Sequence, residues 1–205
     1  MNKKDLLLSI AKVGYKIAYA ANLNFSTYDM VKKIPICISL FTILVGILGI
    51  GWPQFLSKCV SAMVLIVGII SIYIEKFTTD IDSYKDRGIT NTDYVNQLRS
   101  LYLQVKNMDE GADFDAIEKK YMAIEQEFNN TSEANQILLA GWSAHFKLFY
   151  EKDVSWMDEQ LNFHWWKDKT PQTGKVVLII AIIIVICYCI KVPCLNAFLT
   201  IFFNN

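Results

Sequence analysis

The sequence predicts an all-α membrane protein made of a two-helix transmembrane hairpin, a cytoplasmic helical bundle and a third, C-terminal helix that is transmembrane or interfacial. Two observations support this fold class. Residues 34–74 and residues 176–205 each contain one Lys and no acidic residue, whereas residues 75–175 hold 18 acidic and 12 basic side chains. Within residues 75–170 the apolar residues recur at helical spacing, without an alternating strand pattern. We therefore expect apolar helices in lipid and polar helices in water.

The hairpin is predicted at residues 31–75, with spans at 34–52 and 57–74. The first span has 19 residues without a charge, and as a helix it measures about 28 Å, nearly the thickness of the hydrocarbon core of a bilayer. Lys58, near the start of the second span, can extend its ammonium group to the lipid head groups. Because the connection between the spans is so short, the two helices are expected to run antiparallel.

The distribution of lysines predicts the orientation in the membrane. Six lysines precede the first span and three lie shortly before the C-terminal apolar run, whereas the loop between the first two spans offers only Lys58. Loops rich in Lys and Arg stay on the cytoplasmic side of a membrane. The N-terminus and residues 75–175 are therefore expected in the cytoplasm, with the spans in the inner (cell) membrane and the C-terminus outside.

Residues 1–30 are predicted to form a basic amphipathic helix. Leu6, Ile10, Val13 and Ile17 recur at helical spacing, and the lysines lie elsewhere around the helix. Such a helix can either lie on the anionic inner leaflet or pack on the cytoplasmic domain, and the sequence favours neither. A cleaved signal peptide is disfavoured because lysines interrupt the apolar stretch.

Residues 76–170 are predicted to be a cytoplasmic domain of several helices. The helix of the second span is expected to continue as far as Gly88, and a last short helix is expected to begin at Ser155, with Asp158 completing a capping box. One helix carries a narrow apolar seam at spacings of 3, 4, 3 and 4, which is typical of coiled coils and predicts a contact between copies of the chain. The seam consists of Phe114, Ile117, Tyr121, Ile124 and Phe128.

The C-terminal segment, residues 174–205, is predicted to be the third transmembrane or interfacial helix. Lys191 interrupts its apolar run, and Pro193 follows. A single span kinked at Pro193 would leave Lys191 near the middle of the membrane, at a cost of about 3 kcal/mol. We favour a span that ends near Lys191, so that this lysine supplies a charge at the membrane interface or in a pore, followed by an apolar tail in the interface.

No residue pattern indicates catalysis. His145 and His164 lie far apart, and neither has Cys, His or Glu at zinc-binding spacing. The acidic cluster around Gly111 is too short and irregular for a calcium loop, and no Gly-rich phosphate loop is present. The acidic middle region also lacks a basic groove for nucleic acid. We therefore expect a protein that is not an enzyme, with no cofactor, no metal and no direct nucleic-acid partner.

Small and hydroxylated side chains line one face of each predicted span. Such faces allow two helices to approach closely and to form hydrogen bonds across the contact. Two interpretations compete: the faces close a tight intramolecular hairpin, or they form an oligomer seam or the wall of a narrow pore. The residues are Ser39, Thr42, Gly46 and Gly49 on the first span and Ser57, Ser61, Gly68 and Ser71 on the second.

The order of these features resembles the SLATT effector family of bacterial conflict systems. A short basic N-terminal helix, a tight two-span hairpin and a cytoplasmic helical region follow one another, and the resemblance covers residues 5–166. The added C-terminal apolar run resembles the branch of that family that is often linked to reverse transcriptases. The match is one of architecture and helical pattern.

This resemblance implies a membrane effector that oligomerises and forms a pore or disrupts the inner membrane in antiviral defence, killing the infected cell. The expected partners are the lipid bilayer, further copies of the chain, and a trigger, which is a sensor protein or its signal product. The alternative is a membrane-tethered helical adaptor that holds a cytosolic partner and never conducts ions.

Overall fold

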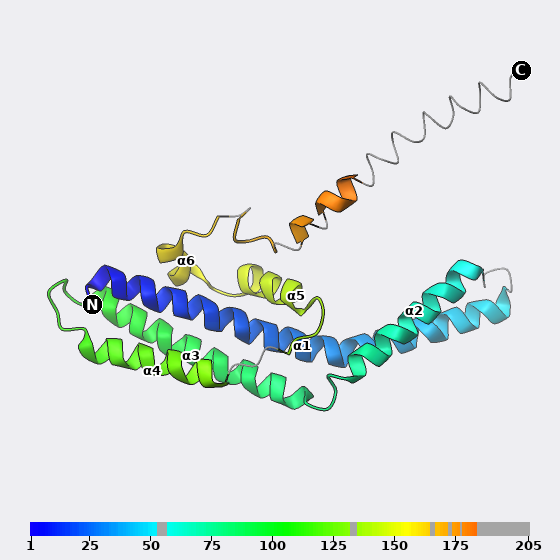
Figure 1. The fold of residues 1–205 in the computed structure, drawn as a ribbon, viewed down its shortest axis with the longest axis horizontal. Coiled ribbons are helices and arrows are strands. Elements are labelled where there is room, and N and C mark those ends of the chain that lie inside the picture. The colour runs from blue at the N-terminus through cyan, green and yellow to red at the C-terminus, as the bar shows by residue number, and fades with distance from the viewer. Residues whose placement is uncertain (53–56, 132–134, 165–166, 172–173, 177, 184–205) are drawn as a thin grey trace, which may run out of the picture. The chain divides into compact units, whose positions relative to one another are not determined.

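The computed structural model of the 205-residue chain describes residues 1–52, 57–131, 135–164, 167–171, 174–176 and 178–183. The described residues are helical or lie in turns and loops, and they contain no strand, which confirms the all-α prediction. The chain divides into two units, Met1–Asn162 and Phe163–Asn205. The helices labelled in Figure 1 all belong to the first unit.

α1 (Lys3–Gly51) is a single helix of 49 residues, about 73 Å long at the usual rise per residue. It begins after Asn2, whose side-chain oxygen accepts a hydrogen bond of 2.8 Å from the N–H of Asp5. The sequence predicted separate helices at residues 1–30 and 34–52, but no break divides them. The change from polar to apolar composition leaves the hydrogen-bond ladder intact, and the helix continues through Pro35, which removes one backbone donor.

The N-terminal half of α1 lies at the centre of a helical bundle. Leu6, Ile10 and Ile17 are fully buried. α3 (Ile81–Asn107) runs alongside this half of α1, and α4 (Asp115–Thr131) packs on α3 and α1 (Figure 1). Of the two surroundings that the sequence left open for the amphipathic helix, the structure shows packing on the helical domain.

The apolar seam of α4 is buried within one chain. Each of its five side chains is at most 8% exposed, because α4 packs against α3 and α1. The 3-and-4 spacing identified the buried residues, but such a stripe can be covered by a helix of the same chain as well as by another copy. The structure therefore assigns an intramolecular contact, in place of the predicted oligomer contact, to Phe114, Ile117, Tyr121, Ile124 and Phe128.

Gly88 does not end a helix. α2 (Lys58–Glu75) stops earlier, a turn at residues 76–80 follows, and Gly88 lies inside α3. A Cβ added at Gly88 would lie 2.8 Å from a ring carbon of Phe25 on α1. The missing side chain thus allows α1 and α3 to approach closely. The prediction that Gly88 ends a helix was wrong, because it relied on the helix-breaking tendency of glycine alone.

The other face of α1 is covered by α5 (Ala140–Phe146), the π-helical turn η2 (Lys147–Glu151) and α6 (Ser155–Leu161) (Figure 1). Trp156 of α6 is 5% exposed and packs against Gly14 of α1. The indole occupies the space that a side chain at position 14 would need. This contact fixes α6 on the N-terminal half of α1.

The capping box predicted for α6 does not form. The helix does begin at Ser155, but the preceding Asp153 supplies the hydrogen bonds at this end. Its carboxylate accepts from the Ser155 N–H at 3.1 Å and from the Ser155 hydroxyl at 2.6 Å. These bonds, together with the nearby Arg99, lower the pKa of Asp153.

In the second unit the structure describes helical residues at 174–176 and 178–183, inside the predicted C-terminal segment 174–205. Lys191 lies outside the described residues, so its predicted place at the membrane interface or in a pore stays a prediction.

We expect Gly14→Ala to weaken the docking of α6. The added methyl group would overlap the Trp156 indole, and overpacking of this kind costs about 1–3 kcal/mol, whereas helix propensity alone favours alanine by about 1 kcal/mol. Thermal unfolding and limited proteolysis near α6 measure the effect. Gly46→Ala is the matched control, because a Cβ there meets nothing within 4 Å, and it should be neutral or stabilising. A Gly14→Ala protein at least as stable as the parent would contradict the contact.

Candidate functional site in the α1–α2 pair

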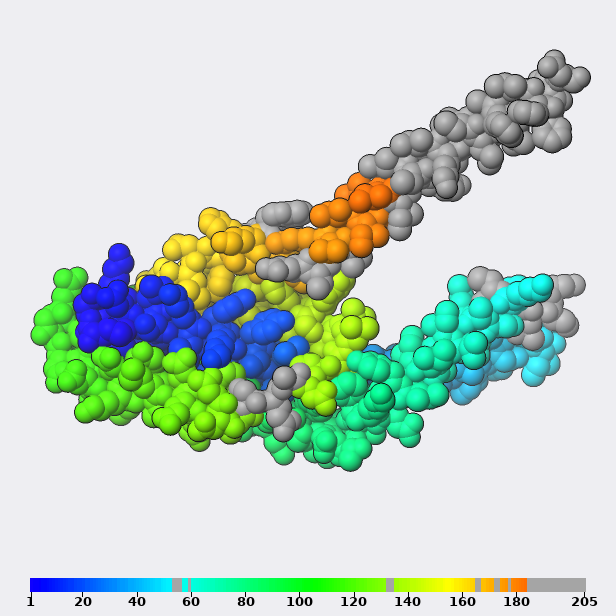
Figure 2. Space-filling model, in the orientation of Figure 1, coloured from blue at the N-terminus to red at the C-terminus, as the bar shows by residue number. Residues whose placement is uncertain are grey.

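The C-terminal half of α1 lies side by side with α2 (Figures 1 and 2). Together they expose a large apolar surface. Ile36, Ile47 and Ile72 are 61%, 62% and 67% exposed. An 18-residue window of α1 reaches a mean hydropathy of 2.4 and is only 11% buried, so by length and composition α1 can cross a membrane. The apolar part of α2, Val60–Glu75, is shorter. Contiguous apolar surface of this extent marks contact with lipid or with another protein.

A narrow seam joins the two helices. On α1, Val45 and Gly49 are buried and Leu48 is partly buried. On α2 the least exposed side chains recur at spacings of 4, 3, 4 and 3, as expected for helices that pack at a small angle. These α2 residues are Val60, Val64, Val67, Ser71 and Ile74. Aliphatic side chains therefore make most of the contact within the pair.

The small and hydroxylated residues lie mostly outside this seam. Gly49 is buried and Ser71 is partly buried. The other six are exposed: Ser39, Thr42 and Gly46 on α1, and Ser57, Ser61 and Gly68 on α2. A Cβ added at Gly46 or at Gly68 would meet nothing within 4 Å. Packing among the described residues thus leaves these six residues uncovered, and we refer to them below as the small-residue face.

Helical geometry places the small-residue face on one side of the pair. Successive residues of a helix are rotated by about 100° around its axis. On each helix, the exposed small residues are rotated by about 70–80° from the side that contacts the partner helix. The rotation has the same sense as increasing residue number on both helices. Because both helices are right-handed and run in opposite directions, this offset turns both sets toward the same side. The pair therefore has one side of small side chains and other sides of large aliphatic ones.

Three of the four hydroxyl groups of this face donate hydrogen bonds within their own helices. Ser39 and Thr42 each donate to the carbonyl four residues earlier at 2.9 Å, and Ser61 does so at 3.3 Å. Such bonds satisfy the hydroxyl proton where no water is available. The face can therefore contact lipid without a water-filled pore, while the hydroxyl oxygens keep lone pairs that a donor on a neighbouring helix can use.

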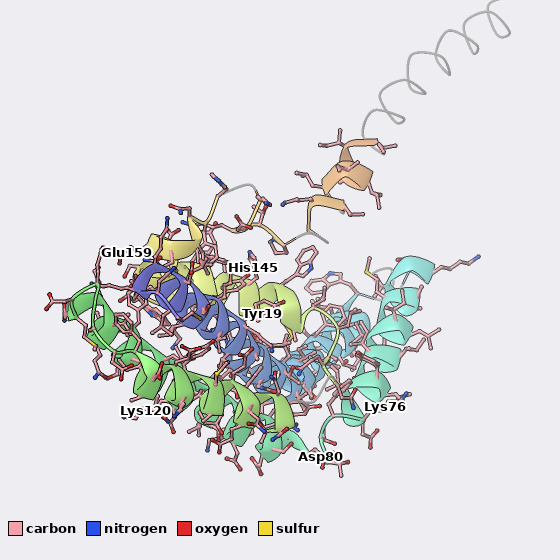
Figure 3. All side chains as sticks on the ribbon, turned by 60° about the vertical axis from the view of Figure 1, so that its left-hand side comes forward. Tyr19, Lys76, Asp80, Lys120, His145 and Glu159 are labelled. Carbon is pink, nitrogen blue, oxygen red and sulfur yellow. The ribbon has the colours of Figure 1, made fainter. Side chains whose placement is uncertain are left out.

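An apolar cluster fixes the base of the pair to the bundle. The buried members of this joint are Val31, Ile74, Phe77, Tyr84, Ile137 and Ala140. The Tyr84 hydroxyl donates to the Asn135 carbonyl at 2.9 Å. Figure 3 labels Lys76 and Asp80 at the turn between α2 and α3, next to this joint. Because the joint contains residues of α1, α2, α3 and α5, a change in the packing of the bundle reaches both helices of the pair.

A belt of buried polar residues precedes the joint on α1. It consists of Asn22, Asn24, Ser26 and Thr27, each at most 7% exposed. The Ser26 hydroxyl donates to the Ser143 hydroxyl at 3.0 Å, and the Thr27 hydroxyl donates to the Gln136 side-chain oxygen at 2.7 Å. The helical spacing of the apolar residues did not predict this belt, although the cluster of polar residues just before an uncharged apolar span was a usable signal. Buried polar groups need their partners, so the belt fixes the register of α1 against the segment around α5.

Asp29 joins α1 to the end of α5. Its carboxylate accepts a hydrogen bond from Lys147 at 2.6 Å and lies 3.3 Å from the ammonium group of Lys33. Burial opposes the charged form, but the two lysines outweigh it and hold the pKa of Asp29 below its usual value. This carboxylate therefore stays ionised at neutral pH.

Two further ion pairs hold α6 and the residues before it on α3. Lys106 contacts both oxygens of Glu159, which Figure 3 labels, at 2.7 and 2.8 Å. The fully buried Tyr102 donates its hydroxyl to the same carboxylate at 3.1 Å. Lys106, and then Tyr102, lower the pKa of Glu159. Arg99 and Asp153 form the second pair at 2.8 Å.

The two histidines do not lie in a reactive cluster of the described residues. His145 is 9% exposed, and its ring centroid lies 4.8 Å from that of Phe149 (Figure 3). His164 lies in the second unit, where its backbone N–H donates to Asp168 at 3.0 Å. Among the described residues no group of three or more His, Cys, Asp or Glu side chains is placed to hold a metal ion. The α1–α2 pair is thus the best-defined candidate site.

Two adjacent apolar helices attached to a polar helical domain are the features of a two-transmembrane effector domain. Residues 1–178 match the family described as SMODS and SLOG-associating 2TM effector domain 6, and the chain belongs to this SLATT family. The resemblance drawn from the order of features is therefore confirmed. The match begins at residue 1, so it includes the half of α1 that is buried in the bundle. Comparison with curated proteins and with solved structures found no significant match.

We expect reversal of one charge in the Lys106–Glu159 pair to loosen α6, and reversal of both to restore it. Lys106→Glu or Glu159→Lys places like charges within contact distance, which should raise the hydrogen-exchange rate of the α6 amides. The double variant re-forms the pair with opposite polarity. If the double variant exchanges as fast as either single variant, the pair does not hold α6.

Proposed function

We propose that this chain is an effector of the inner membrane that, when a partner sensor or its signal product acts on the cytoplasmic bundle, assembles and forms a pore or disrupts the bilayer. The continuity of α1 carries this proposal. One helix is buried in the bundle at its N-terminal end and exposes apolar side chains at its C-terminal end, with no break between. A force or rotation applied to the bundle is therefore transmitted directly to the spans. The proposal includes no catalytic step.

The proposed topology is a transmembrane hairpin of α1 and α2 with the bundle in the cytoplasm. The lysines support this orientation, because six precede the first span, whereas only Lys58, the first residue of α2, lies at the far end of the pair. The role we propose is cell suicide in antiviral defence, and the family's description as a two-transmembrane effector domain supports an effector role of this kind. The chain's own residues supply the membrane-breaching part of that role.

The small-residue face supports assembly through the spans. Its six residues are exposed and lie on one side of the pair, which suits the close approach of a second hairpin. The seam on α4 is occupied within the chain, so the proposal places the contact between copies in the membrane. A trigger would have to bind the assembled arrangement more tightly than the resting one.

One observation favours a second function, a membrane-tethered adaptor that holds a cytosolic partner and never conducts. The hydroxyls of Ser39, Thr42 and Ser61 donate to carbonyls of their own helices, so these three groups do not require water beside them. An adaptor would use the bundle surface alone and would be indifferent to changes on this face.

Gly46→Leu is expected to abolish membrane breaching while leaving insertion intact. The added side chain would fill open space on the small-residue face and block close approach of another helix. Gly51→Leu is the matched control: it also meets open space, but it lies roughly opposite this face on α1 at about 100° per residue. Depolarisation on overexpression in bacteria, followed with a potential-sensitive dye, measures the effect.

The two functions give different results in this assay. The effector predicts depolarisation by the parent and by Gly51→Leu, with none by Gly46→Leu at equal membrane content. If Gly46→Leu depolarises cells as strongly as the parent, the assignment of this face is wrong. If the parent is inert even with its trigger present but still captures a partner through the bundle, the adaptor is the function.

A further inference from the structure

The turn before α5 exposes large apolar side chains outside the α1–α2 pair. Leu138 is 72% exposed, Leu139 is 55% exposed, and Trp142, in the first turn of α5, is 37% exposed. The neighbours Ile137 and Ala140 are buried in the joint, at 4% and 0%. The chain thus anchors Ile137 and Ala140 in the joint and turns the two leucines between them outward. We refer to Leu138, Leu139 and Trp142 as the apolar lip.

The backbone of the lip is held in an unfavourable conformation. Leu139 has φ 71° and ψ −7°, in the left-handed region that bulky L-residues rarely adopt. A glycine or an asparagine would adopt it more easily. Residues held in such conformations cluster at functional sites, and here the strain accompanies an exposed leucine side chain.

The lip lies where the exposed apolar surface of α2 ends. The backbone N–H of Leu138 donates a hydrogen bond of 3.1 Å to the hydroxyl of Tyr73 on α2. Tyr73 is itself 38% exposed, and Ile72 beside it is 67% exposed. In Figure 1 the start of α5 lies at the end of the bundle from which the α1–α2 pair extends. The lip therefore adjoins the exposed apolar surface of α2 in the proposed transmembrane hairpin.

We propose that the apolar lip is a second membrane-docking surface, which inserts into the boundary between head groups and acyl chains of the leaflet next to the bundle. Lipid is the occupant because the lip adjoins the surface that the bilayer must cover if the hairpin spans it. Leucine and tryptophan are the side chains that peripheral segments bury at this depth, about 5–10 Å into the interface. The lip would hold the bundle against the membrane at a point separate from the spans.

A photocrosslinking experiment on the full chain tests this proposal. A diazirine amino acid replaces Leu138, and the protein is reconstituted in vesicles of phosphatidylethanolamine and phosphatidylglycerol. The same probe at Met122, which is 51% exposed on α4, is the negative control, and at Ile43, 58% exposed on α1, it is the positive control. We expect lipid adducts at position 138 about tenfold above those at position 122.

Each outcome decides the proposal. Lipid adducts at 138 and 43 but not at 122 support it. Adducts between two copies of the chain at position 138 would show that a second copy covers the lip and would overturn the proposal. Reaction of the diazirine with water alone would overturn it too. Failure at position 43 as well would instead show that the hairpin does not lie in lipid, which separates a failure of the lip from a failure of the proposed topology.

A second variant tests the role of the Leu139 side chain without disturbing its left-handed backbone. Leu139→Asn removes the apolar side chain but suits the left-handed backbone, so the fold should be kept. In the chain probed at 138 it should lower the lipid adducts several-fold. Unchanged adducts with Leu139→Asn would show that Leu139 takes no part in docking.

Discussion

The structure depends on one constraint: a single uninterrupted helix, α1, must suit two surroundings. Its N-terminal half is enclosed by the other helices of the bundle, whereas its C-terminal half exposes aliphatic side chains beside α2. A helix pairs its backbone groups internally, so it can pass from protein core into lipid without leaving them unsatisfied. An end at that boundary would leave terminal N–H and carbonyl groups in need of partners. Continuing the helix avoids this cost and makes the bundle and the spans one mechanical element.

The contacts around the middle of α1 determine its resting position. The polar belt pairs Ser26 with Ser143 and Thr27 with Gln136, and Asp29 is held by Lys147. These contacts are directional, so sliding or rotating α1 would break several at once. The contacts in the apolar joint that follows them along α1 are less directional, so they restrict the position of α1 less. In the proposed mechanism, a trigger that alters the bundle would therefore have to offset the loss of these polar contacts.

The sequence predicted which residues are buried better than what covers them. The spacing of Leu6, Ile10 and Ile17 predicted one face of a helix, and the seam of α4 was located correctly, but periodicity does not distinguish a partner helix in the same chain from one in another copy. The prediction of a helix break near residue 31 was wrong, because a helix can continue from the protein core into an apolar segment without a change of secondary structure. Gly88 was misassigned because close approach to Phe25 depends on tertiary packing. The small residues of the spans were visible in the sequence, but only the structure shows which of them the packing of α1 against α2 leaves uncovered.

The distance between spin labels at Lys12 and Ile43, measured by pulsed electron spin resonance in lipid vesicles, tests the central claim most directly. Both side chains are exposed on α1, one in the bundle and one in the predicted span. A continuous helix predicts a single narrow distribution near about 46 Å. A broad distribution, or one centred at a clearly shorter distance, would mean that α1 bends or breaks between the bundle and the membrane. In that case the bundle could not act on the spans as proposed.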